Sequence, residues 1–373
     1  MKKNRFTLTA AVMAILFGGA LTSCSDDDPA DEPVTFETLA GIYTINSGNQ
    51  GNKIPGSITS YNYADGTVTD AMTDAFMQAN GIALGDTPQQ ALVYGSKMYI
   101  AVSQSNLIWV TDPHSLKIIE KIVPTGDVAT PRALTAHDGK VYASMYTGYV
   151  CRIDTASLAI DNTLKVGPNP EELAVANNKL YVANSDGMNY LNGYADCSIS
   201  VIDLPAMTEH KIKDISKVLN PTKMASNGTE VFTICMGNYG DVPATVKKIS
   251  GDNVQDICAG TLMAINGNEL YVINSPYGPN VVPTYEVYST ATGSKIRDMV
   301  SETVDSPSCI AVDPVTGDIV ILSYTLGSSG YAQYSEPCYG KIYAADGTFR
   351  TRFTCGVGAI SLAFIHDTAI LKN

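Results

Sequence analysis

One segment of this sequence recurs along most of its length. The clearest copies are TPRALTAHDGKVYA at residues 130–143 and NPEELAVANNKLYVAN at residues 169–184. A repeat of about 40 to 50 residues is typical of a propeller blade built from four short strands. Successive copies start at Pro88, Pro131, Pro170, Pro221, Gly260, Pro307 and Gly358, which are 43, 39, 51, 39, 47 and 51 residues apart.

Each copy keeps one order of elements. An apolar strand is followed by a tight turn with Asn, Asp or Gly, a second strand of the Leu-Tyr-Val type, a connection of variable length, and a third strand. The third strands end near an aspartate, as at Asp112, Asp154 and Asp203, and a fourth strand follows, as at 164–166. β-Branched and aromatic residues fill the segments between turns, and no convincing helical period occurs after residue 23. The sequence therefore predicts an all-β protein.

The two ends of the repeat region complete each other. Residues 357–365 read as a first strand, with a further extended segment expected at 367–371, whereas residues 41–46 and 57–63 read as later strands. Joining them in one blade removes exposed sheet edges and closes a ring. We therefore predict a seven-bladed β-propeller of four-stranded antiparallel blades over residues 37–373, closed by a composite blade from both termini. Neighbouring repeats bury their surfaces against each other, so one domain of this size is reasonable.

The N-terminus has the parts of an export signal. Lys2, Lys3 and Arg5 precede an apolar run over residues 6–21, which is too short to span a bilayer comfortably. Residues 21–24, LTSC, resemble a lipobox, so residues 1–23 are expected to be a cleaved signal peptide and Cys24 the lipidated residue. A buried apolar helix is the alternative, which the flanking basic and acidic segments disfavour.

The segment after Cys24 is acidic. Residues 25–33, SDDDPADEP, offer nothing to a core, so residues 24–36 are predicted to be a solvated tether. The run resembles the export signal that sends Bacteroidetes lipoproteins to the outer face of the outer membrane, although a plain acidic linker would look similar. We expect a lipid anchor in the outer membrane, with the protein facing the cell exterior.

Charge and cysteine content narrow the classes of partner. The formal net charge is −13, and loss of residues 1–23 would make it −16. Nucleic acid and anionic lipid surfaces are unsuitable partners for such a chain, because they require clustered Lys and Arg. Seven cysteines follow Cys24 without a C-x-x-C pair, so no zinc site is indicated and at least one thiol is unpaired or pairs between chains.

The variable connections are expected to share one face of the propeller. If the strands of a blade are A to D, the short A–B and C–D turns lie on one face, and the B–C and D–A connections lie on the other. The B–C connections are rich in Asn, Gly, Ser and Tyr, residues that favour adaptable binding, although the same residues also serve as turn formers and sheet residues. The candidate ligand-binding residues are Asn49, Gln89, Arg132, Tyr146, Glu172, Asn189, Tyr190, Asn238, Tyr239, Tyr277 and Tyr331.

For two of these candidates, an ion pair within the protein is the alternative to ligand binding. Arg132 and Glu172 are expected beside the central channel, where a salt bridge between adjacent blades is as reasonable as ligand contact.

Asp186 and Asp241 could serve glycoside hydrolysis or bind calcium, but solvated loop acids are commoner. Three histidines fall near the A–B and C–D turns and the fourth in an outer strand, so we predict no enzyme, no catalytic residue and no metal site. They are His114, His137, His366 and His210.

Several runs carry a family resemblance over almost the whole chain after the signal. They are residues 46–51 (NSGNQG), 84–89 (LGDTPQ), 166–171 (VGPNPE) and 236–241 (MGNYGD). With the repeat core, these runs resemble the YncE-like seven-bladed propellers, and within them the Bacteroidetes surface lipoproteins of the BtuG type. The resemblance implies capture of cobalamin (vitamin B12) or related corrinoids at the cell surface and delivery to a TonB-dependent outer-membrane transporter.

Cobalamin is compatible with the loop composition. It is a large disc fringed with amides, and a ring of Asn, Tyr and backbone groups could hydrogen-bond its rim. The acidic surface would not attract its phosphate, which must face solvent or meet Arg132 or Lys53. The alternatives are a surface glycan-binding lipoprotein and a scaffold that docks on a transporter without a small ligand of its own.

Overall fold

The computed structural model describes residues 35–370 except 65 and 205. Residues 37–369 form one compact unit. The predicted signal peptide, Cys24 and the tether up to residue 34 lie outside the described residues. Within the described part of the chain, no helix is long and apolar enough to cross a membrane.

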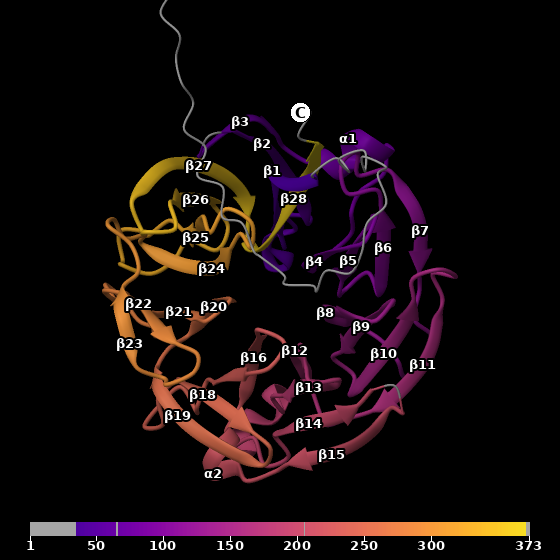
Figure 1. The fold of residues 1–373 in the computed structure, drawn as a ribbon, viewed down its shortest axis with the longest axis vertical. Coiled ribbons are helices and arrows are strands. Elements are labelled where there is room, and N and C mark those ends of the chain that lie inside the picture. The colour runs from indigo at the N-terminus through magenta and orange to yellow at the C-terminus, as the bar shows by residue number, and fades with distance from the viewer. Residues whose placement is uncertain (1–34, 65, 205, 371–373) are drawn as a thin grey trace, which may run out of the picture. The chain divides into compact units, whose positions relative to one another are not determined.

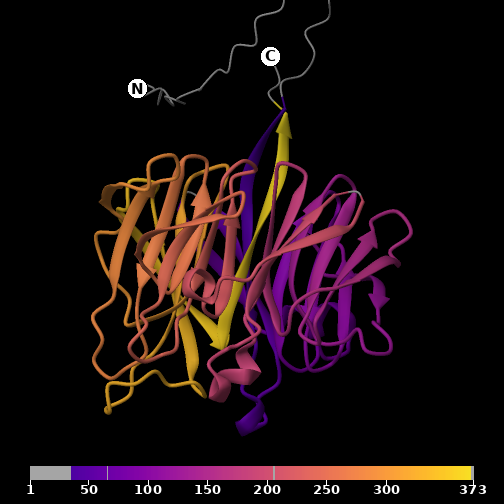
Figure 2. The same cartoon turned by 90° about the horizontal axis from the view of Figure 1, so that it is seen from below.

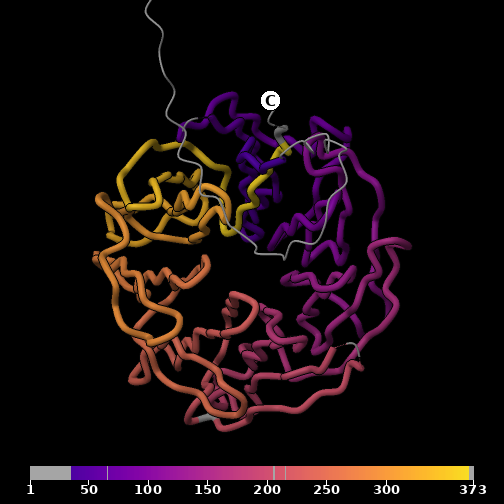
Figure 3. The backbone as a smooth tube through the Cα atoms, viewed as in Figure 1, coloured from indigo at the N-terminus to yellow at the C-terminus, as the bar shows by residue number. Residues whose placement is uncertain are grey.

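The compact unit is a ring of seven four-stranded sheets, which confirms the predicted fold class (Figure 1). We call the sheet β28-β1-β2-β3 the composite blade, and number the others 1 to 6 along the chain. The composite blade comprises β28 (Ala359–Ile370), β1 (Thr35–Asn46), β2 (Ser57–Ala64) and β3 (Thr67–Met72), so the C-terminal strand lies innermost. Figure 3 shows the two ends of the described chain meeting in this blade.

Blades 1 to 6 each use four consecutive strands. Blades 1 to 3 contain β4 (Pro88–Tyr94), β5 (Lys97–Val102), β6 (Leu107–Thr111), β7 (Ile118–Ile122); β8 (Pro131–His137), β9 (Lys140–Met145), β10 (Tyr149–Asp154), β11 (Ile160–Lys165); and β12 (Pro170–Ala176), β13 (Lys179–Asn184), β14 (Ser198–Asp203), β15 (Thr208–Ile212). Blades 4 to 6 contain β16 (Pro221–Ser226), β17 (Val231–Cys235), β18 (Thr245–Ser250), β19 (Asn253–Ala259); β20 (Leu262–Asn266), β21 (Glu269–Asn274), β22 (Thr284–Ser289), β23 (Lys295–Asp298); and β24 (Ser306–Val312), β25 (Ile319–Tyr324), β26 (Pro337–Tyr343), β27 (Phe349–Val357).

Four short helical segments interrupt this pattern within the described residues. They are η1 (Gln50–Asn52), α1 (Ala75–Asn80), η2 (Gly187–Asn192) and α2 (Ile215–Val218). The sequence analysis predicted none of them, because each is too short to show a helical period. The expected separate extended segment after residue 366 is instead the end of β28, which continues to residue 370.

The inner strands begin within two residues of the predicted repeat starts. Five of them begin at or one residue before a proline, and the strand register shifts just after each of these prolines. Proline suits this position because the first residue of a strand on the sheet edge need not donate to the ladder. Its periodic occurrence is therefore a property of the inner edge of the blade.

The core lies between the blades. Seven clusters of buried apolar side chains occur among the described residues, and each joins two neighbouring blades. The second and third strands are covered on both sides and are almost entirely buried, as in β13, whereas the outer strand β11 alternates between half-buried and exposed residues. Adjacent repeats thus bury each other's surface, as expected for this architecture.

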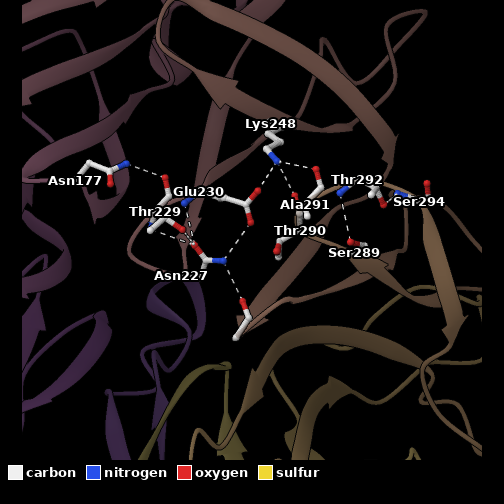
Figure 4. A network of polar contacts seen from close by, with 11 residues as sticks. Asn177, Asn227, Thr229, Glu230, Lys248, Ser289, Thr290, Ala291, Thr292 and Ser294 are labelled. Atoms are coloured by element: carbon white, nitrogen blue, oxygen red, sulfur yellow. Dashed lines mark hydrogen bonds and ion pairs between the residues drawn. The ribbon is translucent and has the colours of Figure 1, made fainter. Parts of the chain in front are cut away.

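The A–B turns are tight and hold neighbouring blades together. Asp138-Gly139 and Asn177-Asn178 both have two consecutive residues with positive φ, the backbone of a two-residue hairpin turn. Contacts between turns of adjacent blades include His137 Nε2 with Asn178 Oδ1, Asn177 Nδ2 to the Thr229 carbonyl, Asn227 Nδ2 to the Gly267 carbonyl, and His366 Nε2 with Asp313 Oδ2. Figure 4 shows the part of this network around Asn227, Glu230 and Lys248.

The two faces of the ring differ. Figure 2 shows η1 and η2 on one face and the free ends of β1 and β28 on the opposite face. The first, which we call the loop face, carries the B–C and D–A connections. The second, which we call the turn face, carries the A–B and C–D turns, as the strand directions predicted.

Candidate functional site

The B–C connections vary in length around the ring. They cover residues 47–56, 103–106, 146–148, 185–197, 236–244, 275–283 and 325–336. Those of blades 1 and 2 have only four and three residues, whereas the other five have nine to thirteen. The connections of five blades can therefore extend further from the loop face than those of blades 1 and 2.

Exposed apolar side chains gather in the long connections. Of the eighteen exposed large apolar residues in the described chain, one lies in an A–B or C–D turn and ten lie in B–C connections. These ten are Met188, Tyr190, Leu191, Tyr239, Val242, Tyr277, Val282, Leu326, Tyr331 and Tyr334. A concentration of exposed apolar groups on one face marks an interaction surface, which favours the loop face as the functional one.

Two tyrosine pairs lie on the loops of blades 5 and 6. The ring centroids of Tyr277 and Tyr331 are 5.7 Å apart, and those of Tyr324 and Tyr334 are 4.9 Å apart. Tyr277 is 77 % exposed, so its ring contributes little to the core and is available to a ligand. Burial raises the pKa of Tyr324, so its hydroxyl remains a protonated hydrogen-bond donor well above neutral pH.

The second tyrosine pair borders a pocket of about 320 Å³ on the loop face. The pocket is lined by Ser47, Gly48, Asn49, Gln50, Thr87, Gln104, Tyr324, Tyr334 and Gly358. Its walls therefore combine amides from the composite blade and blade 1 with aromatic rings from blade 6. Such a mixture of apolar surface and a few polar groups is characteristic of small-molecule sites.

Asn49 reaches this pocket, but its amide also holds the loop. Its Oδ1 accepts a hydrogen bond from the Asn52 backbone N–H at 3.0 Å and so caps η1. Its Nδ2 donates to the Tyr334 carbonyl at 3.0 Å, which ties the composite blade to blade 6. Gln50 and Gln104, which the sequence analysis did not select, provide the freer amides of the pocket.

Arg132 and Tyr146 form a second polar site, next to the channel. The Arg132 Nε lies 2.6 Å from Oε2 of Glu171, and its guanidinium carbon lies 5.1 Å from the centre of the Tyr146 ring. Burial raises the pKa of the Glu171 carboxyl, which Arg132 partly offsets. Burial also raises the pKa of Tyr146.

Glu172 is engaged between blades 3 and 4. Its Oε1 lies 2.6 Å from the ammonium of Lys223, and its Oε2 accepts a hydrogen bond from the Met224 backbone N–H at 3.1 Å. This is a salt bridge between adjacent blades, which the sequence analysis gave as the alternative to ligand contact for Glu172. Arg132 makes the corresponding bridge to Glu171, a residue that the sequence analysis did not select.

The other candidate asparagines serve their own loops. Asn238 Oδ1 accepts the backbone N–H groups of Gly240 and Val242, both at 3.0 Å, and Asn189 Nδ2 donates to Asp186 Oδ2 at 2.9 Å. Tyr190 and Tyr239, next to them, are 59 % and 66 % exposed. The loops thus use their asparagines as internal supports and present tyrosines to solvent.

Gln89 lies on β4 at the inner edge of blade 1. Its Nε2 is 3.5 Å from the Thr87 carbonyl, a marginal hydrogen bond. Its neighbour Gln90 is more firmly engaged, because its Oε1 accepts the Leu134 backbone N–H at 2.6 Å. Gln89 therefore keeps its amide available at the channel edge.

The residues considered for catalysis or metal binding are used structurally. His114, His137 and His366 lie on the turn face and His210 on outer strand β15, as the strand order predicted. Asp186 accepts Asn189 and the Asp196 backbone N–H, and Asp241 accepts Asn238, whose hydrogen bond lowers the pKa of the Asp241 carboxyl. Within residues 35–370, apart from the two gaps, no group of three or more His, Cys, Asp or Glu side chains is placed to hold a metal ion.

Comparison with known proteins locates the chain among propellers without indicating its ligand. A family model described as a domain of unknown function (DUF5074) matches residues 40–187, which cover most of β1 and all of β2 and β3 in the composite blade, blades 1 and 2, and the first two strands of blade 3. No curated protein matches the sequence.

Solved structures share the fold at low sequence identity. A protein from Lactobacillus plantarum is 13 % identical with a TM-score of 0.58, over 88 % of this chain and 100 % of that one. Hydrazine synthase of Kuenenia stuttgartiensis is 15 % identical with a TM-score of 0.54, over 77 % and 95 %. The WD40 β-propeller domain of Doa1 is 10 % identical with a TM-score of 0.55, over 79 % and 92 %. These likenesses establish the fold alone, since one fold hosts many functions.

Proposed function

We propose that this protein is a non-enzymatic surface lipoprotein that binds a bulky small molecule on its loop face, with cobalamin or a related corrinoid as the ligand. The observation that carries the proposal is the concentration of exposed tyrosines and aliphatic side chains in the B–C connections. Amides lie beside these groups in the loop-face pocket. A large disc with an apolar surface and an amide rim matches this combination.

The position of the N-terminal strand is compatible with a loop face that stays open to ligand. β1 begins on the turn face, opposite the loops (Figure 2). A lipid on Cys24 would then leave the loop face unobstructed. We propose that the protein is anchored in the outer membrane, faces the cell exterior and passes its ligand to a TonB-dependent transporter.

Calorimetry and thermal-shift measurements with cyanocobalamin and cobinamide test the ligand. The experiment uses residues 33–373, which retain every described residue of the propeller. At a ligand concentration 100 times Kd, binding adds about 2.7 kcal/mol of stability and therefore raises the melting temperature. No heat and no shift with either corrinoid would overturn the ligand assignment.

The aromatic loops also favour glycans as a second candidate, because tyrosine rings such as Tyr277 can cover sugar faces. Retardation in a polysaccharide affinity gel, with no binding of either corrinoid, would support this function. Co-purification with a TonB-dependent transporter from solubilised outer membranes tests the partner, and protease treatment of intact cells tests the location.

A further inference from the structure

The loop face has one low region, which we call the low sector. It consists of the short B–C connections 103–106 and 146–148 of blades 1 and 2 and the strand ends beneath them. We infer that the ligand lies over the low sector and that Gln104 contacts it directly. This inference rests on the proposed function and assigns the ligand's position on the loop face.

Long connections flank the low sector on both sides. The 47–56 connection with η1 comes from the composite blade, and the 185–197 connection with η2 comes from blade 3; both extend beyond the strands (Figure 2). The first is packed tightly against blade 1, because a Cβ added to Gly56 would lie 2.1 Å from Cδ of Pro88. The low sector is therefore bounded by two built walls.

The polar side chains of the short connections are mostly occupied. Ser105 Oγ accepts the Asp86 backbone N–H at 2.8 Å, Asn106 Oδ1 accepts the Thr130 backbone N–H at 2.9 Å, and Thr147 Oγ1 accepts the Ala129 backbone N–H at 3.0 Å. These bonds fix the connections to the D–A segments beside them. The floor of the low sector is thus rigid.

Gln104 differs from its neighbours. Its side chain is exposed and lines the loop-face pocket, and no hydrogen bond joins its amide to another residue in the described part of the chain. An amide with both a donor and an acceptor available can pair with an amide or a hydroxyl of a ligand. Gln104 is therefore the residue in this region best placed for direct recognition.

Two charged groups beside the low sector are engaged by neighbouring side chains. Arg132, on the blade 2 side, is paired with Glu171, and Asp86, on the composite side, accepts hydrogen bonds from Thr87 Oγ1 at 2.8 Å and weakly from Gln50 Nε2 at 3.4 Å. Such a site selects a ligand by its amide and hydroxyl fringe and its apolar face. A phosphate on the ligand is expected to point to solvent.

Two matched tryptophan substitutions test the position. Gln104→Trp fills the low sector, whereas Ser96→Trp places the same side chain on an exposed turn of the same blade, on the turn face. Calorimetry with cyanocobalamin should show binding at least ten-fold weaker for Gln104→Trp and unchanged for Ser96→Trp. Gln104→Ala, which removes only the amide, should weaken binding about three-fold or more, and the thermal midpoints of all three should match the unmodified chain.

The outcomes separate the two proposals. If the unmodified chain binds and both Gln104 variants bind equally well, the low-sector position is wrong and the proposed function stands. If the unmodified chain binds neither cyanocobalamin nor cobinamide, the corrinoid function is wrong and the low-sector inference is overturned with it.

Discussion

Arg132 Nε lies 2.6 Å from a carboxylate oxygen of Glu171, one residue after the proline that starts the inner strand of the next blade. Arg132 itself is one residue after Pro131, so the two side chains occupy the same position in consecutive repeats. The repeat thus places complementary groups at equivalent sites around the channel, and the ion pair joins blade 2 to blade 3.

Removal of Arg132 should destabilise the propeller more than removal of both partners. Arg132→Ala leaves the mostly buried Glu171 carboxylate unpaired, and because Arg132 is one-third exposed we expect a loss of about 2 kcal/mol. Arg132→Ala combined with Glu171→Gln should lose less, because no buried charge is left alone. Urea denaturation of the two single variants and the double variant measures this, and additive losses would contradict it.

A second interblade link predicts a contrast between charged and neutral acceptors. Glu172 accepts the Met224 backbone N–H and pairs with Lys223, while Gln90 accepts the Leu134 backbone N–H without a charge partner. We expect Glu172→Ala to cost about 2 to 3 kcal/mol and Gln90→Ala about 1 to 2 kcal/mol. Denaturation midpoints measure the stability lost in each variant. An equal loss in both, or a larger loss for Gln90→Ala, would be inconsistent with the charge-assisted link.

Tyr190→Ala should separate binding from stability. Because Tyr190 is 59 % exposed, we expect its stability change to stay within about 0.5 kcal/mol, while cyanocobalamin binding weakens at least five-fold, since η2 borders the low sector. Ile119→Ala is the control, since Ile119 is an exposed apolar residue on the outer strand β7 of blade 1. Equal effects of the two variants on binding would argue against a specific role for the tyrosine loops.

Buried thiols predict a pH dependence. Burial raises the pKa of Cys151 and of Cys235 to about 12, above the ordinary value of about 8.5. The folded state therefore keeps protons that the unfolded state releases, and its stability falls as pH rises from about 8.5 towards 12, by up to about 1.4 kcal/mol per pH unit for each thiol. Cys151→Ala should reduce that slope.

The same thiols should resist alkylation. Only the thiolate reacts, so iodoacetamide at pH 8 should leave Cys151 and Cys235 unmodified in the native protein and label both in urea. Mass spectrometry of the two samples gives the answer. Rapid labelling of either residue in the native protein would show that it is not buried as described.

The ring of blades was predictable because each repeat contains residues that identify its turns and strand starts. Paired turn residues such as Asn177-Asn178 and the prolines at the inner strand starts recur at blade spacing, and both reflect local backbone requirements. The composite blade followed from the need to remove sheet edges. Short helices such as η2 were not predicted, because a segment of three to six residues is too short to show a helical period.

The site was predictable as a face but not as a set of side chains. Composition located the B–C connections, yet it does not distinguish an asparagine that supports its own loop, such as Asn238, from an amide that is available, such as Gln104. Glu171 and Glu172 are adjacent in sequence and bond to different blades, a choice set by strand geometry. Tyr334 was missed because its connection is long and irregular.

The central claim is that the loop face captures a corrinoid, and hydrogen–deuterium exchange with and without cyanocobalamin tests it most directly. We predict slower exchange on binding in the connections 47–56, 103–106, 146–148 and 185–197, and unchanged exchange in the A–B turns at 138–139 and 177–178. Slower exchange confined to the turn face, or no change anywhere at saturating ligand, would contradict it.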